Sequence, residues 1–149
     1  MKKFLIFLAL CCLFCSCARR DGKIQDIQSA AGATLEEYGT PHDFVRAEQD
    51  FIATNFGNTD GITDYAVYYA ADGTEFGFFR LSDAGNASDM QNKVRAYLAS
   101  ERESVEALAA LYPADELNAR LSRFDKATVG TTGDVVYYFL TDQIGRAHV

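Results

Sequence analysis

The sequence has no tryptophan, only two prolines and two histidines, and its four cysteines all lie within the first 17 residues. A domain that follows these cysteines has no thiol for a disulfide bond, a redox centre or a thiolate metal site. The two histidines do not form a His-x-x-x-His pair, and metal sites need clustered ligands. We therefore expect neither a metal nor a cofactor.

Basic residues are also scarce. The formal net charge is -7. Setting aside Lys2, Lys3 and Arg146, which lie in segments discussed below, leaves 11 Lys and Arg against 21 Asp and Glu. Such an acidic domain is repelled by phosphate backbones, so nucleic acid is not an expected partner. With 48% hydrophobic residues, the 149-residue chain has enough apolar material for one globular domain.

The chain begins like an exported bacterial lipoprotein. Two lysines precede an apolar run, Phe4–Phe14, that is too short to span a bilayer but has the length of a signal-peptide core. The run leads to Cys17, with the small Ser16 before it and Leu13 four places upstream. This spacing predicts a signal peptide at residues 1–16 and a lipid on Cys17. The alternative is a secretory leader that is cut without lipidation.

Residues 17–23 would then form a lipidated tether. Two acyl chains hold a protein stably on a membrane, where one chain holds it only weakly. We expect attachment to the cell membrane on its extracytoplasmic face, with the membrane as one partner and an unidentified envelope protein or ligand as another. Arg19, Arg20 and Lys23 would either touch anionic headgroups or form a solvated tether.

The last six residues, 144–149, read Ile-Gly-Arg-Ala-His-Val. A common short-read sequencing adapter encodes these same residues in one reading frame, so we interpret them as an artefact and exclude them from the fold. The natural protein is then expected to continue beyond Gln143, and the domain to occupy residues 24–143. His42 becomes the only histidine of this domain, and its loop context predicts a surface position.

Hydrophobic periodicity and turn residues predict an α+β fold. The expected elements are helices and strands separated by Gly, Pro and Asp signals: helices at 24–38 and 44–56, a hairpin of 63–71 with 75–81, a long helix at 88–112, a short helix at 114–121, and a hairpin of 127–130 with 135–141. This order predicts an antiparallel sheet of two hairpins with a long helix between them and two N-terminal helices packed on the sheet.

Both faces of the predicted strands are apolar. We expect the two N-terminal helices to cover one face of the sheet and the long helix to cover the other. The alternative is an exposed aromatic platform that binds a ligand.

Four segments of the chain carry a resemblance to a known family: Val67–Tyr69, Gly77–Leu81, Tyr112–Glu116 and Gly133–Tyr138. Over about residues 65–142 the chain is similar to the uncharacterised bacterial lipoprotein family known as domain of unknown function 4358. The resemblance implies an extracytoplasmic location and a chain that continues past the last strand. It implies no activity, because none is assigned to that family.

One polar residue interrupts the apolar face of the long helix. Glu101 falls near the centre of a stripe made of Met90, Val94, Tyr97, Leu98, Val105, Leu108 and Tyr112. A carboxylate in such a position must be paired, protonated or reached by water. Arg80 on the second strand is the candidate partner, which makes Glu101 and Arg80 a possible buried polar pair. The alternative is a bend near Ser100 that brings Glu101 into solvent.

No catalytic residue stands out from the sequence. A nucleophilic site needs a serine or cysteine beside a base, and the chain has no Gly-x-Ser-x-Gly turn. The sequence therefore favours a non-enzymatic binding or interaction domain. The alternative is an envelope enzyme that acts on a cell-wall polymer through paired carboxylates, which would have to lie about 5 to 9 Å apart in a cleft.

Overall fold

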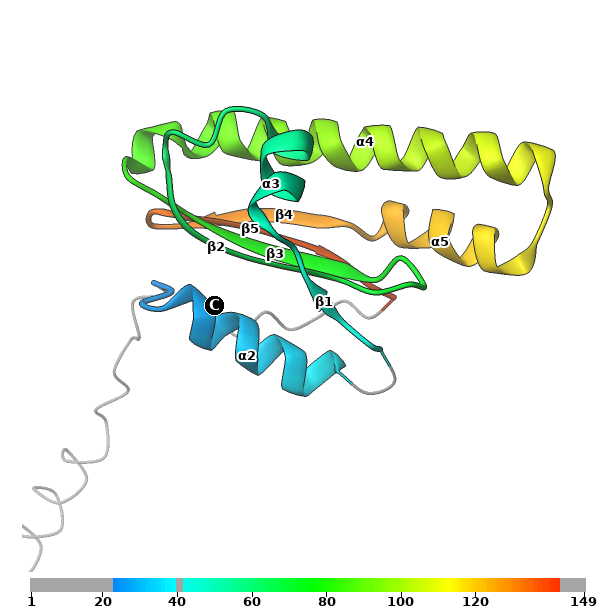
Figure 1. Cartoon of the computed structure of the whole chain (residues 1–149), viewed down its shortest axis with the longest axis horizontal. Helices are drawn as coiled ribbons and strands as arrows, with labels where there is room; N and C mark the ends of the chain where they lie inside the picture. Colours follow the sequence, from blue (N-terminus) through cyan, green and yellow to red (C-terminus); the bar gives the residue numbers. More distant parts are fainter. Residues whose placement is uncertain (1–22, 40–41, 143–149) are drawn as a thin grey trace, which may run out of the picture.

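The computed structural model describes residues 23–39 and 42–142. The predicted signal peptide, Cys17 and the segment 144–149 lie outside these residues. The described chain forms a five-stranded antiparallel sheet in the order β1-β2-β3-β5-β4, with helices on both faces (Figure 1). The predicted α+β class, with its antiparallel sheet and its long helix between two hairpins, is confirmed.

Two hairpins supply four of the five strands. β2 (Ile62–Tyr69) and β3 (Glu75–Leu81) form the first, and β4 (Thr128–Thr132) and β5 (Val135–Leu140) form the second. Gly73 and Gly133 sit in the two turns with φ of 86° and 59°, a backbone region that glycine enters without strain. Because β3 pairs with β5, the two hairpins join at the centre of the sheet.

One face of the sheet is covered by α2 (Ile27–Tyr38). Asp26 caps this helix by accepting hydrogen bonds from the backbone N–H groups of Gln28 and Ser29, which explains why the helix begins later than residue 24. Its buried side chains pack against inward-facing residues of the strands: Ile27 and Ala31 on the helix, with Ala66, Phe76, Phe78, Val135 and Phe139 on the sheet.

The other face is covered by α3 (Gln49–Phe56) and α4 (Ala87–Leu111), which follows the short 3-10 helix η1 (Ala84–Asn86). α5 (Asp115–Asp125) then folds back along α4 (Figure 1). The core on this face combines side chains of two helices and three strands: Ile52, Phe56, Val67, Phe79, Val94, Tyr97 and Tyr138.

Two expectations for the N-terminal region are corrected. The segment 44–56 is not one helix, because Val45–Arg46 forms strand β1 and pairs with Tyr68 and Tyr69 at the edge of the sheet. The chain then passes to the opposite face, so α3 packs beside α4 rather than beside α2. Both changes follow from pairing with β2. Val45 and Arg46 add a short strand to the edge of β2, although local periodicity assigns these two residues to a helix.

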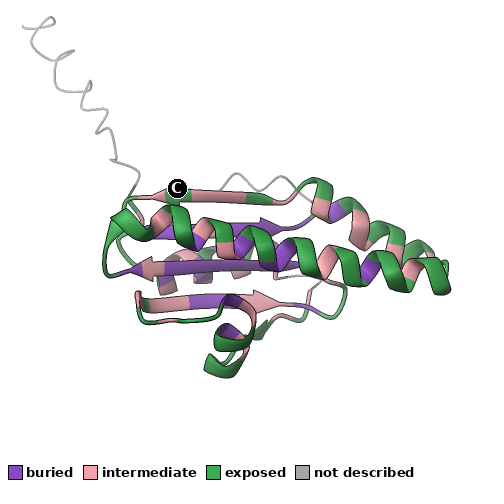
Figure 2. Ribbon diagram, turned by 90° about the horizontal axis from the view of Figure 1, so that it is seen from above, coloured by how far each residue is buried: buried purple, intermediate pink, exposed green. Residues whose placement is uncertain are grey.

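Most aromatic residues of β3 and β5 are buried, and they lie on both faces of the sheet, whereas four strand tyrosines, Tyr65, Tyr68, Tyr69 and Tyr137, are half-buried. The strands therefore do not form the exposed aromatic platform. In β3 and β5 the residues Phe76, Phe78, Phe79, Tyr138 and Phe139 are each at most 9% exposed. Figure 2 shows the corresponding buried stretches of the strands beneath the helices. None of the helices in the described part of the chain combines the length and the hydropathy needed to cross a bilayer.

Candidate functional site

The structure does not bring the predicted pair of Arg80 and Glu101 together. One Nη atom of Arg80 lies 2.8 Å from Oδ2 of Asp134, and the other donates to the carbonyl oxygens of Ile24 and Gln25 at 2.9 and 3.1 Å. The cause is the alternation of side chains along β3. Phe79 and Leu81 face α4, whereas Arg80 points to the face that carries α2.

Glu101 is half-buried on α4, one turn after Tyr97. Its carboxylate raises the pKa of Glu75, so its electrostatic neighbour is a second carboxyl group rather than an arginine. The apolar stripe of α4 is buried from Met90 to Val105. Beyond that point Leu108 and Tyr112 are 43% and 68% exposed, because the helix continues past the sheet.

These positions make a first prediction. Arg80→Ala should lower the free energy of unfolding by about 1 to 2 kcal/mol, since it removes the contacts that hold the segment before α2. Glu101→Leu acts on the other face, so the two effects should add within about 0.5 kcal/mol. Urea unfolding of both single variants and the double variant measures this. A coupling above 1 kcal/mol would mean that the two side chains interact after all.

A buried carboxyl group that the sequence does not single out lies between the sheet and α4. Glu75, the first residue of β3, is only 7% exposed. The hydroxyl of Tyr97 donates to its Oε2 at 2.9 Å, and the hydroxyl of Tyr138 donates to its Oε1. This Glu75 group, formed by Glu75, Tyr97 and Tyr138, therefore joins α4 to the two central strands.

Burial raises the pKa of Glu75 to about 7, and the negative charge of Glu101 adds to the rise. The hydrogen bonds from the two tyrosines act in the opposite direction but do not cancel it. Burial and the nearby Glu75 charge in turn raise the pKa values of Tyr97 and Tyr138 above the ordinary value. The tyrosines thus stay protonated while Glu75 changes its charge near neutral pH.

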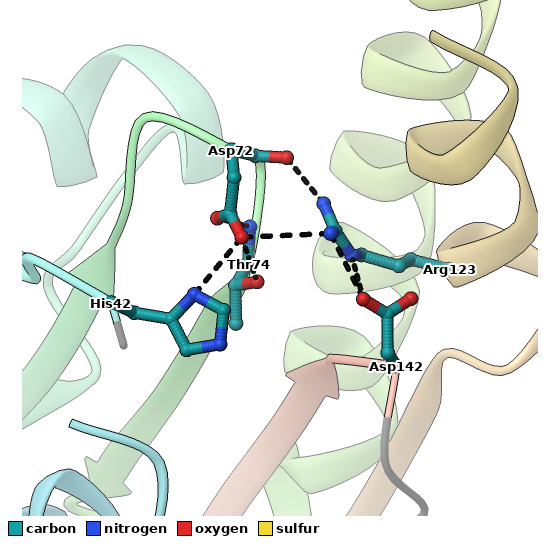
Figure 3. Close-up of polar contacts among 5 residues, drawn as sticks. All are labelled: His42, Asp72, Thr74, Arg123 and Asp142. Carbon is teal, nitrogen blue, oxygen red and sulfur yellow. Dashed lines mark hydrogen bonds and ion pairs between the residues drawn. The ribbon is translucent and has the colours of Figure 1, made fainter. Parts of the chain in front are cut away.

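A second polar cluster lies at the β2–β3 turn, close in sequence to Glu75 (Figure 3). Asp72 Oδ2 lies 2.9 Å from Nδ1 of His42 and accepts a hydrogen bond from the Thr74 hydroxyl at 3.1 Å. Arg123 of α5, which is 7% exposed, donates to the Asp72 carbonyl and lies 2.9 Å from Oδ2 of Asp142. This turn cluster connects four segments that are distant in the sequence.

The turn cluster has part of the geometry of a catalytic dyad, because an aspartate holds a histidine through Nδ1. Burial acts to raise the pKa of Asp72, but hydrogen bonds from Thr74 and the charges of Arg123 and His42 outweigh it and lower the pKa. Among the described residues of this cluster the only hydroxyl is that of Thr74, and it donates to Asp72. The turn cluster therefore connects segments of the fold. His42, which the sequence predicts to lie in a surface loop, is one of its members.

Elsewhere on the surface, described residues line two hollows. One, of about 230 Å³, is lined by residues of α3 and β2, including Gln49, Ile52 and Asp64. The other, of about 200 Å³, lies between Asp60 and Lys93. Neither hollow is lined by residues of the Glu75 group or of the turn cluster. Among residues 23–39 and 42–142, no three His, Cys, Asp or Glu side chains are grouped so that they could hold a metal ion.

Three of the four large exposed apolar side chains of the described residues gather where α4 turns into α5, and the fourth, Val45, lies on the edge strand β1. Leu111 is 73% exposed and Tyr112 is 68% exposed, with Leu108 at 43%. Figure 2 shows this end of the two helices projecting beyond the strands. We call this surface the apolar tip and define it as the exposed residues of the segment 107–113: Ala107, Leu108, Ala110, Leu111, Tyr112 and Pro113.

Comparison of the chain with protein-family models, with curated proteins and with solved structures finds no match. The similarity to the lipoprotein family described above therefore stays a prediction. Any functional conclusion depends on the chain's own residues.

Proposed function

We propose that this protein is an exported, lipid-anchored bacterial envelope protein whose domain binds a partner and does not catalyse a reaction. The anchor is the lipid on Cys17, after removal of residues 1–16. The domain then stands on the extracytoplasmic face of the cell membrane, joined to it by a short tether.

The arrangement of the domain along its longest axis supports this proposal. The start of the described chain, the blue segment that leads into α2, lies at one end of the molecule, and the turn between α4 and α5 that carries the apolar tip lies at the opposite end (Figure 1). A lipid attached six residues before Lys23 would place that first end near the membrane. The tip, with its exposed Leu111 and Tyr112, would then face away from the membrane, where a partner can reach it.

The polar groups of the domain favour binding over catalysis. An enzyme that acts through paired carboxylates needs both groups open to substrate in a cleft. Glu75 has the raised pKa that suits a general acid, but it is 7% exposed and a tyrosine holds each of its oxygens. In the turn cluster Arg123 pairs with both Asp72 and Asp142.

Metabolic labelling with a palmitate analogue tests the anchor. The wild-type protein should carry the label and fractionate with membranes, because acylation of Cys17 is the only attachment that the sequence predicts. Cys17→Ser should lose the label. Cys15→Ser, a change within the predicted leader, is the matched control and should keep both properties. A Cys17→Ser variant that still takes up label would contradict the proposal.

A further inference from the structure

We infer that the apolar tip is a docking surface for a protein whose binding pocket is apolar at its centre and basic at its rim. This inference rests on the proposed function, since it names the partner class and the surface that the anchored domain would use. It is carried by the exposure, the charge and the rigidity of the α4–α5 end.

The exposure of the tip exceeds what scattered surface residues produce. Six of the seven residues from 107 to 113 are exposed, and all six are apolar or aromatic. Leu111 and Tyr112 have two of the largest exposures among the big apolar side chains of the described chain. Tyrosine and other large side chains in such clusters are typical centres of protein–protein interfaces.

The charge around the tip has one sign. From residue 103 to residue 119 the chain has four acidic residues and no basic residue. All four are exposed: Glu103, Glu106, Asp115 and Glu116. Only Glu106 forms an ion pair in the described structure, with Arg102 at 2.8 Å. Acidic residues suit the first turn of α5, which accounts for Asp115 and Glu116 but not for Glu103.

This charge selects among the possible occupants of the tip. An anionic lipid surface repels an acidic rim, so the tip does not suit insertion into a bilayer. A second copy of the chain would bring two acidic rims together at its own tip, which is also unfavourable. A protein pocket with an apolar floor and Lys or Arg at its edge complements both the centre and the rim.

The two helices that carry the tip are joined behind it. Arg102 on α4 contacts Asp125 on α5 at 2.7 Å, and it also contacts Glu106 on its own helix at 2.8 Å. The contact with Asp125 favours the observed arrangement of the two helices. A surface that is already ordered loses less conformational entropy on binding, which is expected of a docking site.

Site-specific photo-crosslinking in living cells that make the full lipoprotein tests this inference. Benzoylphenylalanine placed at Leu108 should give a discrete adduct with another protein. On the folded surface of that protein, Lys or Arg side chains should surround the site of the crosslink. The same probe at Ala33, an exposed position on α2, is the matched control and should give no such adduct.

Substitutions then test the apolar centre and the acidic rim of the tip separately. Leu111→Ser should reduce the adduct at least tenfold, as expected for a central contact. Glu103→Lys with Glu116→Lys should also reduce it, whereas Glu36→Lys on α2 should not. All these positions are exposed, so the melting temperature should stay within error for every change except Glu116→Lys, which places a cation in the first turn of α5 and should lower it slightly. Circular dichroism of each variant shows whether loss of folding explains a loss of adduct.

Several results would overturn the inference. They are an adduct between two copies of the chain, an adduct with lipid, equal adducts at Leu108 and Ala33, or no adduct at all. An adduct that survives the charge reversals would contradict the proposal that the pocket of the partner has a basic rim. The palmitate label keeps the two proposals apart. A labelled protein without an adduct contradicts only the docking surface, and an unlabelled protein contradicts the proposed function.

Discussion

Raising the pH from 5 to 8 should lower the free energy of unfolding through Glu75, by up to about 3 kcal/mol. The folded state raises the pKa of this carboxyl from 4.5 to about 7, so the folded protein binds the proton more tightly than the unfolded chain does. The stabilisation by that proton is fully present below pH 4.5. It is lost as the pH rises toward 7, and above that value the contribution is constant.

Urea unfolding at a series of pH values measures this effect, and Glu75→Gln isolates it from all other titrating groups. Glutamine keeps the size of the side chain and stays neutral, so the variant should lose the Glu75 part of the slope between pH 5 and 8. Because the amide has one acceptor oxygen in place of two, one tyrosine hydroxyl loses its acceptor, so the pH slope and not the absolute stability reports the titration of Glu75. Glu36→Gln, an exposed change on α2, should give a curve parallel to that of the wild type.

Glu101 offers a second test of the same group. Its charge raises the pKa of Glu75, so Glu101→Gln should shift the loss of stability to lower pH and make it smaller. The hydrogen bonds from Tyr97 and Tyr138 would be unchanged in that variant. Equal pH slopes in the wild type and in Glu75→Gln would show that Glu75 does not titrate in this range.

Arg123→Ala should cost about 2 to 4 kcal/mol of stability. The guanidinium is almost fully buried and contacts the carbonyl and carboxylate of Asp72 as well as the carboxylate of Asp142. Without it, acceptors at the β2–β3 turn and at the end of β5 lose their donor. Thermal and urea unfolding measure the change.

Two further variants show whether charge or geometry matters at this position. Arg123→Lys keeps the charge but cannot make the same set of contacts, so its loss should be intermediate. Arg95→Ala removes an exposed arginine whose hydrogen bonds are 3.4 to 3.5 Å long, and it should change stability by no more than about 0.5 kcal/mol. Equal effects at the two arginines would mean that the turn cluster does not stabilise the fold.

Local signals in the sequence determined most of the elements. Asp72-Gly73 and Gly133-Asp134 specify tight turns, and the alternation of apolar residues on either side specifies strands. The long run from residue 88 to residue 112 has helical spacing, and α4 occupies Ala87–Leu111. These signals depend on neighbours in the chain, so they could be interpreted without knowledge of the fold.

Tertiary structure decided which distant groups meet. Arg80 was expected beside Glu101, but strand alternation sends it to Asp134 on the opposite face. The residue that faces the tyrosines on the α4 side is Glu75, which looks in the sequence like an ordinary polar residue next to a turn. His42 likewise meets Asp72 only because the chain after α2 returns to the sheet edge. The turn of a hairpin fixes the register of its two strands, but which hairpins join in the sheet and which helix covers which face depend on contacts between distant segments, and these are not encoded in local spacing.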